Sequence, residues 1–146
     1  MASAELTGAG QPTQEDPPRR SSEILLEQTF TEDSLYGVRA AVAAHVATVA
    51  GERVVDTMVL IAHELASNAV RHGGGTGRLR LWLAEGALRC EVSDEGTGLK
   101  DPALAGHILP APSLPGGRGL WIARQLSELR VATSTAGTTV TATLQL

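Results

Sequence analysis

Glu64 and Asn68 stand four residues apart in the segment ELASNAVRH, inside a run whose apolar residues recur at helical spacing. Side chains four residues apart lie on the same side of an α-helix, so both can point into one cleft beside the apolar face. The amide oxygen of Asn68 suits a hard cation such as Mg²⁺, and the carboxylate of Glu64 can orient or deprotonate an attacking hydroxyl. The polar flank of an ordinary amphipathic helix carries the same residue types, so this segment alone leaves both interpretations open.

A second polar segment, from Asp94 through Gly96 to Gly98, directly follows a predicted strand. The alternation of apolar residues in that strand aims the Asp94 carboxylate toward the core face. A buried carboxylate needs a hydrogen-bond donor, and the exocyclic amine of adenine is one such donor. The two glycines allow a sharp turn and a close approach to a ligand. A simple turn that begins at Asp94 is the alternative interpretation.

The third segment, Gly117-Arg118-Gly119-Leu120, follows a proline-rich loop and opens a predicted helix. A glycine-rich helix start offers free backbone N–H groups and the positive end of the helix dipole, and both suit a phosphate group. Arg118 adds a positive charge. Glycines also commonly mark the end of a loop, so this segment is weak on its own.

Several other chemistries are excluded by missing residues. Position 67, four residues after His63, is a serine, so the zinc-protease pair of histidines is absent. Lys100 is the sole lysine and lacks the glycine-rich context of a phosphate-binding P-loop, and Ile122 stands where a dinucleotide-binding loop needs a glycine. Cys90 alternates with apolar residues of a strand, which favours a buried thiol over a nucleophile.

The chain of 146 residues has 12 Lys and Arg residues against 16 Asp and Glu residues, and one cysteine. This length is typical of a single domain that buries enough apolar surface to fold without disulfides. The net charge of −4 argues against the basic surface that nucleic-acid binding requires. The sequence has neither an apolar run of ~20 residues nor a signal peptide. We therefore expect a cytoplasmic protein that binds neither nucleic acid nor a membrane.

The N-terminal half of the chain contains a tail, a strand and two helices. Residues 1–22 have almost no apolar side chains and predict a disordered tail, so the folded domain is expected at residues 23–146. Residues 24–30 predict a strand. Apolar residues at helical spacing then predict one helix from Leu35 to about Ala50 and a second helix over residues 52–72.

The C-terminal half contains two hairpins, a loop and a third helix. Alternating residues over 78–92, interrupted at Glu85-Gly86, predict the first hairpin. Residues 99–116 carry four prolines and predict a long functional loop. A helix at residues 119–129 and a hairpin at residues 130–146 follow. This order predicts an α+β two-layer sandwich, in which a mostly antiparallel mixed sheet is covered on one face by helices.

Taken together and in this order, the three polar segments resemble the motifs of the GHKL ATPases, the superfamily of histidine kinase catalytic domains and type II topoisomerase ATPase domains. The segment from Glu64 to Gly73 resembles the N box, Asp94-x-Gly96-x-Gly98 the G1 box, and Gly117-x-Gly119-Leu120 the G2 box. The resemblance runs from about residue 24 to the C-terminus. Within the superfamily, a stand-alone domain with a short lid resembles the bacterial anti-sigma-factor serine kinases of partner-switching systems.

The resemblance implies a Bergerat ATP-binding fold that binds ATP and Mg²⁺ under a lid formed by residues 99–116. It implies that Asp94 accepts the adenine amino group, Asn68 holds Mg²⁺ and Glu64 is the general base. The other residues implied for the nucleotide site shape its loops or are candidate phosphate contacts: Gly96, Gly98, Gly117, Gly119, Leu120, Arg71, His72 and Arg118. Helical spacing places His72 on the core side, which favours a packed or capping histidine.

The resemblance further implies a serine/threonine protein kinase that regulates transcription. Such an enzyme transfers the γ-phosphoryl group of ATP to an anti-anti-sigma partner and also binds a sigma factor; related kinases suggest a homodimer. Two alternatives remain open. One is a non-catalytic switch that uses ATP to choose between partners, and the other is a histidine-kinase-like ATPase domain without its phosphoacceptor helix.

Overall fold

The computed structural model describes residues 23–96 and 118–146. The predicted tail at residues 1–22 and the predicted lid at residues 99–116 lie outside the described residues. Gly98 and Gly117 lie outside them as well. These predictions therefore stay predictions.

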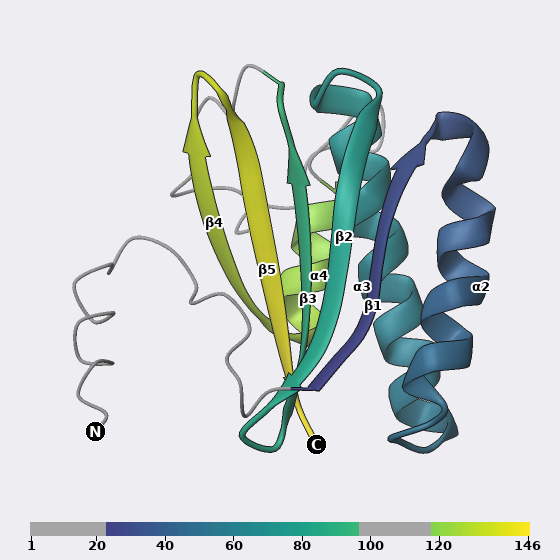
Figure 1. Ribbon diagram of the computed structural model, residues 1–146. Coiled ribbons are helices and arrows are strands. Elements are labelled where there is room, and N and C mark those ends of the chain that lie inside the picture. Colours follow the sequence, from purple (N-terminus) through teal and green to yellow (C-terminus); the bar gives the residue numbers. More distant parts are fainter. Residues whose placement is uncertain (1–22, 97–117) are drawn as a thin grey trace, which may run out of the picture.

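Within residues 23–96 and 118–146, five strands form one open sheet, in the spatial order β1-β2-β3-β5-β4 (Figure 1). The strands are β1 at Glu23–Thr31, β2 at Thr76–Ala84, β3 at Ala87–Asp94, β4 at Glu128–Ser134 and β5 at Gly137–Gln145. All four pairings between these strands are antiparallel, so within the described residues the sheet is antiparallel and not mixed. The predicted strand and both predicted hairpins are confirmed.

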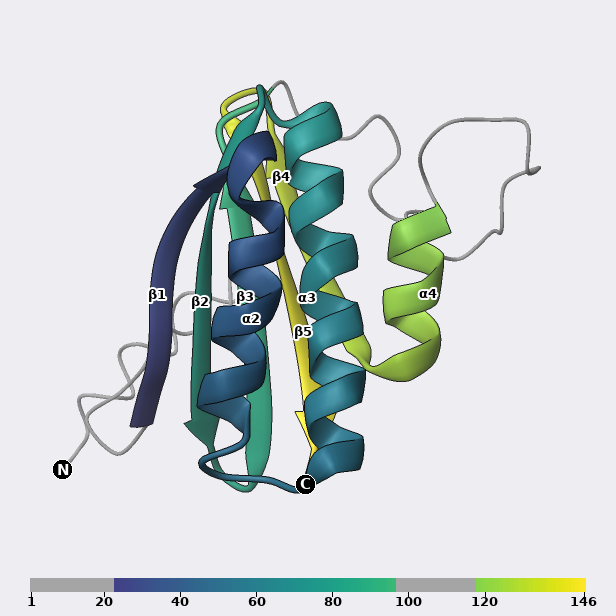
Figure 2. The ribbon, with the colours of Figure 1, turned by 90° about the vertical axis from the view of Figure 1, so that its right-hand side faces the viewer.

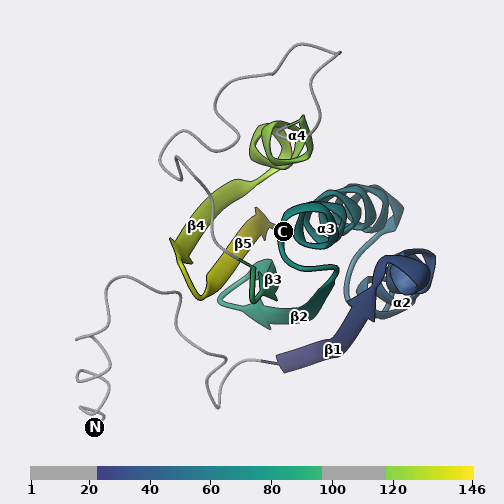
Figure 3. The same cartoon turned by 90° about the horizontal axis from the view of Figure 1, so that it is seen from above.

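Three α-helices of the described part of the chain cover one face of this sheet, as Figures 2 and 3 show from the side and from above. They are α2 at Leu35–Val46, α3 at Glu52–His72 and α4 at Arg118–Leu126, and a single 3₁₀ turn at Glu32–Ser34 precedes α2. The α+β two-layer architecture is thus confirmed. Within the described ranges, no helix is both long and apolar enough to cross a membrane.

Two predicted helix ends are wrong. The first helix ends at Val46 instead of near Ala50, because the Thr48 N–H and hydroxyl both donate to the His45 carbonyl and tighten the chain into a turn. The third helix ends at Leu126 instead of 129. Leu129 continues the helical spacing of apolar residues, but it pairs with Ala142 across β4 and β5 and is buried there as a strand residue.

The core lies between α3 and the sheet. Met58, Ile61 and Leu65 on one side of α3 are buried, and so are Leu79 and Leu81 of β2. This spacing of three and four residues on the helix and of two on the strand is what places one apolar stripe against one apolar face. The long, firmly packed α3 therefore carries its C-terminal half, with Glu64 and Asn68, to a defined end of the sheet.

Cys90 gives a direct test of the packing of β3. Its side chain has no exposed surface, and burial, together with the nearby Glu91 carboxylate, raises the pKa of its thiol to about 12. Because the thiolate is the reactive form, we expect the folded protein to resist thiol-alkylating reagents at neutral pH until it unfolds. Mass spectrometry after timed alkylation, with and without denaturant, measures this. Alkylation of the folded protein as fast as that of a free thiol would contradict the burial.

Candidate functional site

The C-terminal half of α3 brings parts of all three predicted motifs together. At one end, a Cβ atom on Gly96 would lie 2.6 Å from the Gly73 Cα atom and 2.7 Å from the His72 carbonyl oxygen. Further down, a Cβ atom on Gly119 would lie 2.8 Å from the Glu64 Oε1 atom. The loop after β3 and the start of α4 thus both touch α3. The two contact points are Glu64 on α3 and Gly73, which directly follows the helix. They are nine residues apart, or about 13 Å along the helix axis.

Glu64 lies against the first turn of α4. Its side chain is partly buried and makes no hydrogen bond or ion pair to any residue in 23–96 or 118–146. The first backbone N–H groups of a helix have no partner within the helix, and they carry the positive end of its dipole. A carboxylate and a set of anion-binding N–H groups therefore stand side by side, on α3 and α4.

Asn68 lies one turn beyond Glu64 toward Asp94. Its side chain is 7 % exposed, and no residue in the described ranges forms a hydrogen bond with it. Buried amides are ordinarily hydrogen-bonded. The hydrogen-bonding groups of Asn68 are unused by the described residues, so they are available to a ligand. No group of three or more His, Cys, Asp or Glu side chains suited to a metal ion occurs among the described residues. The donor set fits a cation such as Mg²⁺, which keeps several waters and takes one or two protein ligands together with phosphate oxygens.

Asp94 ends β3 at the tip of α3. A Cβ atom on Gly73 would overlap the Asp94 carboxyl group, so the glycine permits this contact. The Asp94 Oδ1 atom accepts a hydrogen bond of 2.8 Å from the Gly96 N–H group. The predicted turn at Asp94 is therefore present, and it uses one carboxylate oxygen. The other oxygen has no hydrogen-bond partner among the described residues and can accept from a ligand.

Thr138 is a candidate site residue that the sequence analysis did not identify. It pairs with Asp94 across β3 and β5, is 5 % exposed and lies 2.8 Å from the Thr133 hydroxyl. Side chains of directly paired residues project from the same face of a sheet. No local pattern marks Thr138, because its position beside Asp94 depends on the pairing of strands more than 40 residues apart.

Arg71, His72 and Arg118 are exposed, and this corrects the expectation that His72 packs against the core. His72 is the last residue of α3. Near it, β3 has its last residue at Asp94 and β2 its first residue at Thr76, so no strand of the described residues covers it. Partial burial lowers the pKa of His72, and the charge of Arg71 lowers it further, while Asp94 acts in the opposite direction. The lowered pKa favours the neutral imidazole, which can donate a hydrogen bond to a phosphate group.

The backbone of Leu120, and not its side chain, is available to the candidate site. Its side chain is buried in the core. This anchors the first turn of α4 and keeps the N–H groups around Gly119 next to Glu64.

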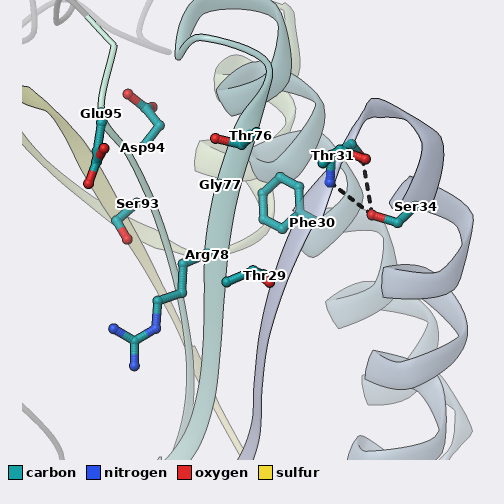
Figure 4. Close-up of a pocket in the computed structure, with 10 residues that line it drawn as sticks. All are labelled: Thr29, Phe30, Thr31, Ser34, Thr76, Gly77, Arg78, Ser93, Asp94 and Glu95. Atoms are coloured by element: carbon teal, nitrogen blue, oxygen red, sulfur yellow. Dashed lines mark hydrogen bonds between the residues drawn. The ribbon is translucent and has the colours of Figure 1, made fainter.

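A cavity of about 700 Å³ opens at the end of the sheet where Asp94 lies (Figure 4). It is lined by the ends of β1, β2 and β3, with Phe30 and Gly77 at its centre and hydroxyl side chains around them. Asp94 is among its lining residues, whereas Glu64, Asn68 and the described part of α4 are not. Asp94 therefore connects this cavity with the α3–α4 arrangement, which carries the groups suited to phosphate chemistry.

This fold and this arrangement define a class of protein. Residues 29–144 match the family model described as the histidine kinase-like ATPase domain. The chain belongs to this family of GHKL ATPase domains. No curated protein matches the chain.

Two solved structures show the same fold. One is the structure of the RsbU and RsbW domains of Rv1364c from Mycobacterium tuberculosis, to which the chain is 24 % identical, with a TM-score of 0.59. The match covers 83 % of this chain and 32 % of that chain. The chain thus spans about a third of that protein's length. It is 19 % identical to the mycobacterial sensor histidine kinase MprB, with a TM-score of 0.53 and coverage of 82 % of this chain and 97 % of that one.

Proposed function

We propose that this protein is an ATP-dependent serine/threonine protein kinase that acts in partner switching. The observation that carries the proposal is the spatial order of three polar side chains along α3 and at its C-terminal end. Glu64 touches the start of α4, unpartnered Asn68 follows one turn later, and Asp94 lies at the helix end. A nucleotide with its base at Asp94 and its phosphates at α4 would align with these groups in that order.

Recognition of the base is assigned to Asp94. With one carboxylate oxygen bonded to the Gly96 N–H group, the other oxygen accepts from the exocyclic amine of adenine. Guanine presents a carbonyl oxygen at that position, so two acceptors would face each other. The proposed site therefore prefers ATP to GTP.

Phosphoryl transfer is assigned to Glu64 and the start of α4. The Glu64 carboxylate takes the proton of a serine or threonine hydroxyl. The hydroxyl oxygen of the serine or threonine forms a bond to the γ-phosphorus, while the bond from the γ-phosphorus to the bridging oxygen of ADP breaks. The N–H groups of the first turn of α4 and Arg118 offset the negative charge on the phosphates. Mg²⁺, held by Asn68, would supply further charge neutralisation on the phosphate oxygens.

The partner proteins are proposed from the resemblance of the three motifs to anti-sigma-factor kinases. A small anti-anti-sigma protein would be the phosphate acceptor, a sigma factor would be the second partner, and the kinase would act as a homodimer. The presence of Glu64 favours an enzyme over a purely ATP-dependent binding switch. A histidine-kinase-like ATPase domain remains the second alternative.

The partner proposal is tested by affinity capture from the lysate of the source cell. The protein is loaded with a non-hydrolysable Mg-ATP analogue or with Mg-ADP, and the captured proteins are identified by mass spectrometry. We expect a sigma factor with the analogue and a small anti-anti-sigma protein with ADP. The Asp94→Ala variant, with weakened nucleotide recognition, is the control and is tested at a nucleotide concentration that saturates only the wild-type protein. Capture of the same proteins in both nucleotide states and by this control would contradict partner switching.

A further inference from the structure

The structure places the β4–β5 hairpin directly against the residue proposed to select the base. We propose that Gly137 is a positioning residue, which holds the end of β3 so that the Asp94 carboxylate meets adenine and rejects guanine. The inference rests on the proposed function, because it concerns how Asp94 selects ATP. It assigns a role to a residue of the β4–β5 hairpin, which lies outside the three predicted motifs.

Gly137 is the first residue of β5 and has a φ of +147°, a backbone conformation that other residues rarely adopt. A Cβ atom at this position would overlap the Asp94 carbonyl oxygen and lie 3.0 Å from both the Asp94 carbonyl carbon and the Glu95 Cα atom. Only a glycine lets the hairpin approach this closely. Figure 1 shows the β4–β5 turn and the end of β3 at the same end of the sheet.

Asp94 is held from two sides by glycine contacts. Gly73 at the end of α3 faces its carboxyl group, and Gly137 faces its carbonyl oxygen. Asp94 also forms the last pair between β3 and β5, with Thr138. A side chain at either glycine would force Asp94 or the backbone beside it to shift, because the added Cβ atom would overlap the Asp94 carboxyl group or its carbonyl oxygen.

The position of the Asp94 carboxylate should affect the binding of ATP more than the binding of GTP. Hydrogen bonds weaken steeply when the donor–acceptor distance or the angle departs from its narrow optimum. A small displacement of Asp94 would therefore weaken the bond to the adenine amine, while GTP, which lacks that bond, would lose little. The ratio of the two affinities reports the position of Asp94 directly.

Gly137→Ala tests the inference, and Gly86→Ala is the matched control. Gly86 also occupies a hairpin turn and has a φ of +78°, but a Cβ atom there would meet no atom within 4 Å, and its hairpin joins β2 to the start of β3, away from Asp94. We expect Gly137→Ala to weaken ATP binding about tenfold with GTP binding unchanged. Gly86→Ala is expected to keep the wild-type ratio, although its positive φ lowers the melting temperature.

A second variant covers the case in which Gly137→Ala does not fold. Thr133→Val keeps Gly137 but removes the hydroxyl that lies 2.8 Å from the Thr138 hydroxyl and 3.5 Å from the Gly137 carbonyl oxygen. It should lower the ratio of ATP to GTP affinity in the same direction by about twofold to threefold. Isothermal titration calorimetry with non-hydrolysable analogues measures the affinities, and circular dichroism verifies folding.

The outcomes separate this inference from the proposed function. If the wild-type protein binds neither nucleotide, or binds both equally, the proposed function fails. If the wild-type protein prefers ATP and each folded variant of Gly137 and Thr133 keeps the full preference, only the positioning role is overturned. A fall in the ratio that Gly86→Ala reproduces at equal stability would also overturn it.

Discussion

Replacing Glu64 by glutamine is expected to abolish phosphoryl transfer while leaving nucleotide affinity nearly unchanged. The amide keeps the size of the carboxylate and the contact with Gly119, but it cannot accept the proton of the attacking hydroxyl. Loss of a general base typically lowers the rate by about 10²- to 10⁴-fold, so no transfer is expected on the timescale of a wild-type single turnover. Single-turnover transfer from labelled ATP to the acceptor protein measures the rate, and calorimetry measures the affinity.

The same substitution elsewhere on α3 provides the control for Glu64→Gln. Glu52 is exposed in the first turn of the helix, more than three turns away from Glu64. Glu52→Gln should transfer phosphate at the wild-type rate. Transfer by Glu64→Gln at the wild-type rate would show that Glu64 is not the base, and the absence of transfer by the wild-type protein and every variant would favour the non-catalytic switch.

Asp94→Ala is the change with the second largest expected effect. It removes the acceptor for the adenine amine and is expected to weaken ATP binding by about 1.5–3 kcal/mol, the range for a hydrogen bond to a charged group. That corresponds to a loss of affinity of about 10- to 150-fold. GTP binding should change much less, so the preference for ATP should nearly vanish. Calorimetric titration of each nucleotide measures both quantities.

Asp94→Asn sharpens this test, because the contact with Gly96 determines which way the side chain faces. The oxygen that accepts from the Gly96 N–H group keeps that role in the variant, so the amide NH₂ group turns toward the ligand. This donor faces the adenine amine unfavourably and the guanine carbonyl favourably. The Asp94→Asn variant should therefore shift the preference toward GTP beyond the effect of alanine. An unchanged ATP preference in both variants would remove Asp94 from base recognition.

The sequence predicted the elements with strong periodicity best. The bounds of α3 agree with the prediction, because a long apolar stripe with a period of 3.6 ends at three successive glycines. The turn at Glu85-Gly86 agrees as well, with both residues at positive φ. The end of α4 was wrong because Leu129 satisfies the helical period and the strand period equally, and only its pairing with β5 decides between them.

The contacts within the candidate site were less predictable than the elements that carry them. The motifs predicted that Glu64, Asn68 and Asp94 share one site, but the sequence does not show which glycines touch them. Gly73 and Gly137 lie against Asp94 from α3 and from the β4–β5 hairpin. Such approaches depend on the packing of remote segments, which no local pattern encodes. The exposure of His72 was missed for the same reason.

The chemical nature of the transferred phosphate tests the central proposal most directly. The protein is incubated with γ-labelled Mg-ATP and the fraction of source-cell lysate that it captures, and the labelled products are treated with acid. Phosphate esters of serine and threonine survive this treatment, whereas phosphohistidine is hydrolysed. The proposed kinase predicts an acid-stable label on a small partner protein, and no label with Glu64→Gln. An acid-labile label, or an acid-stable label that persists with Glu64→Gln, would contradict it.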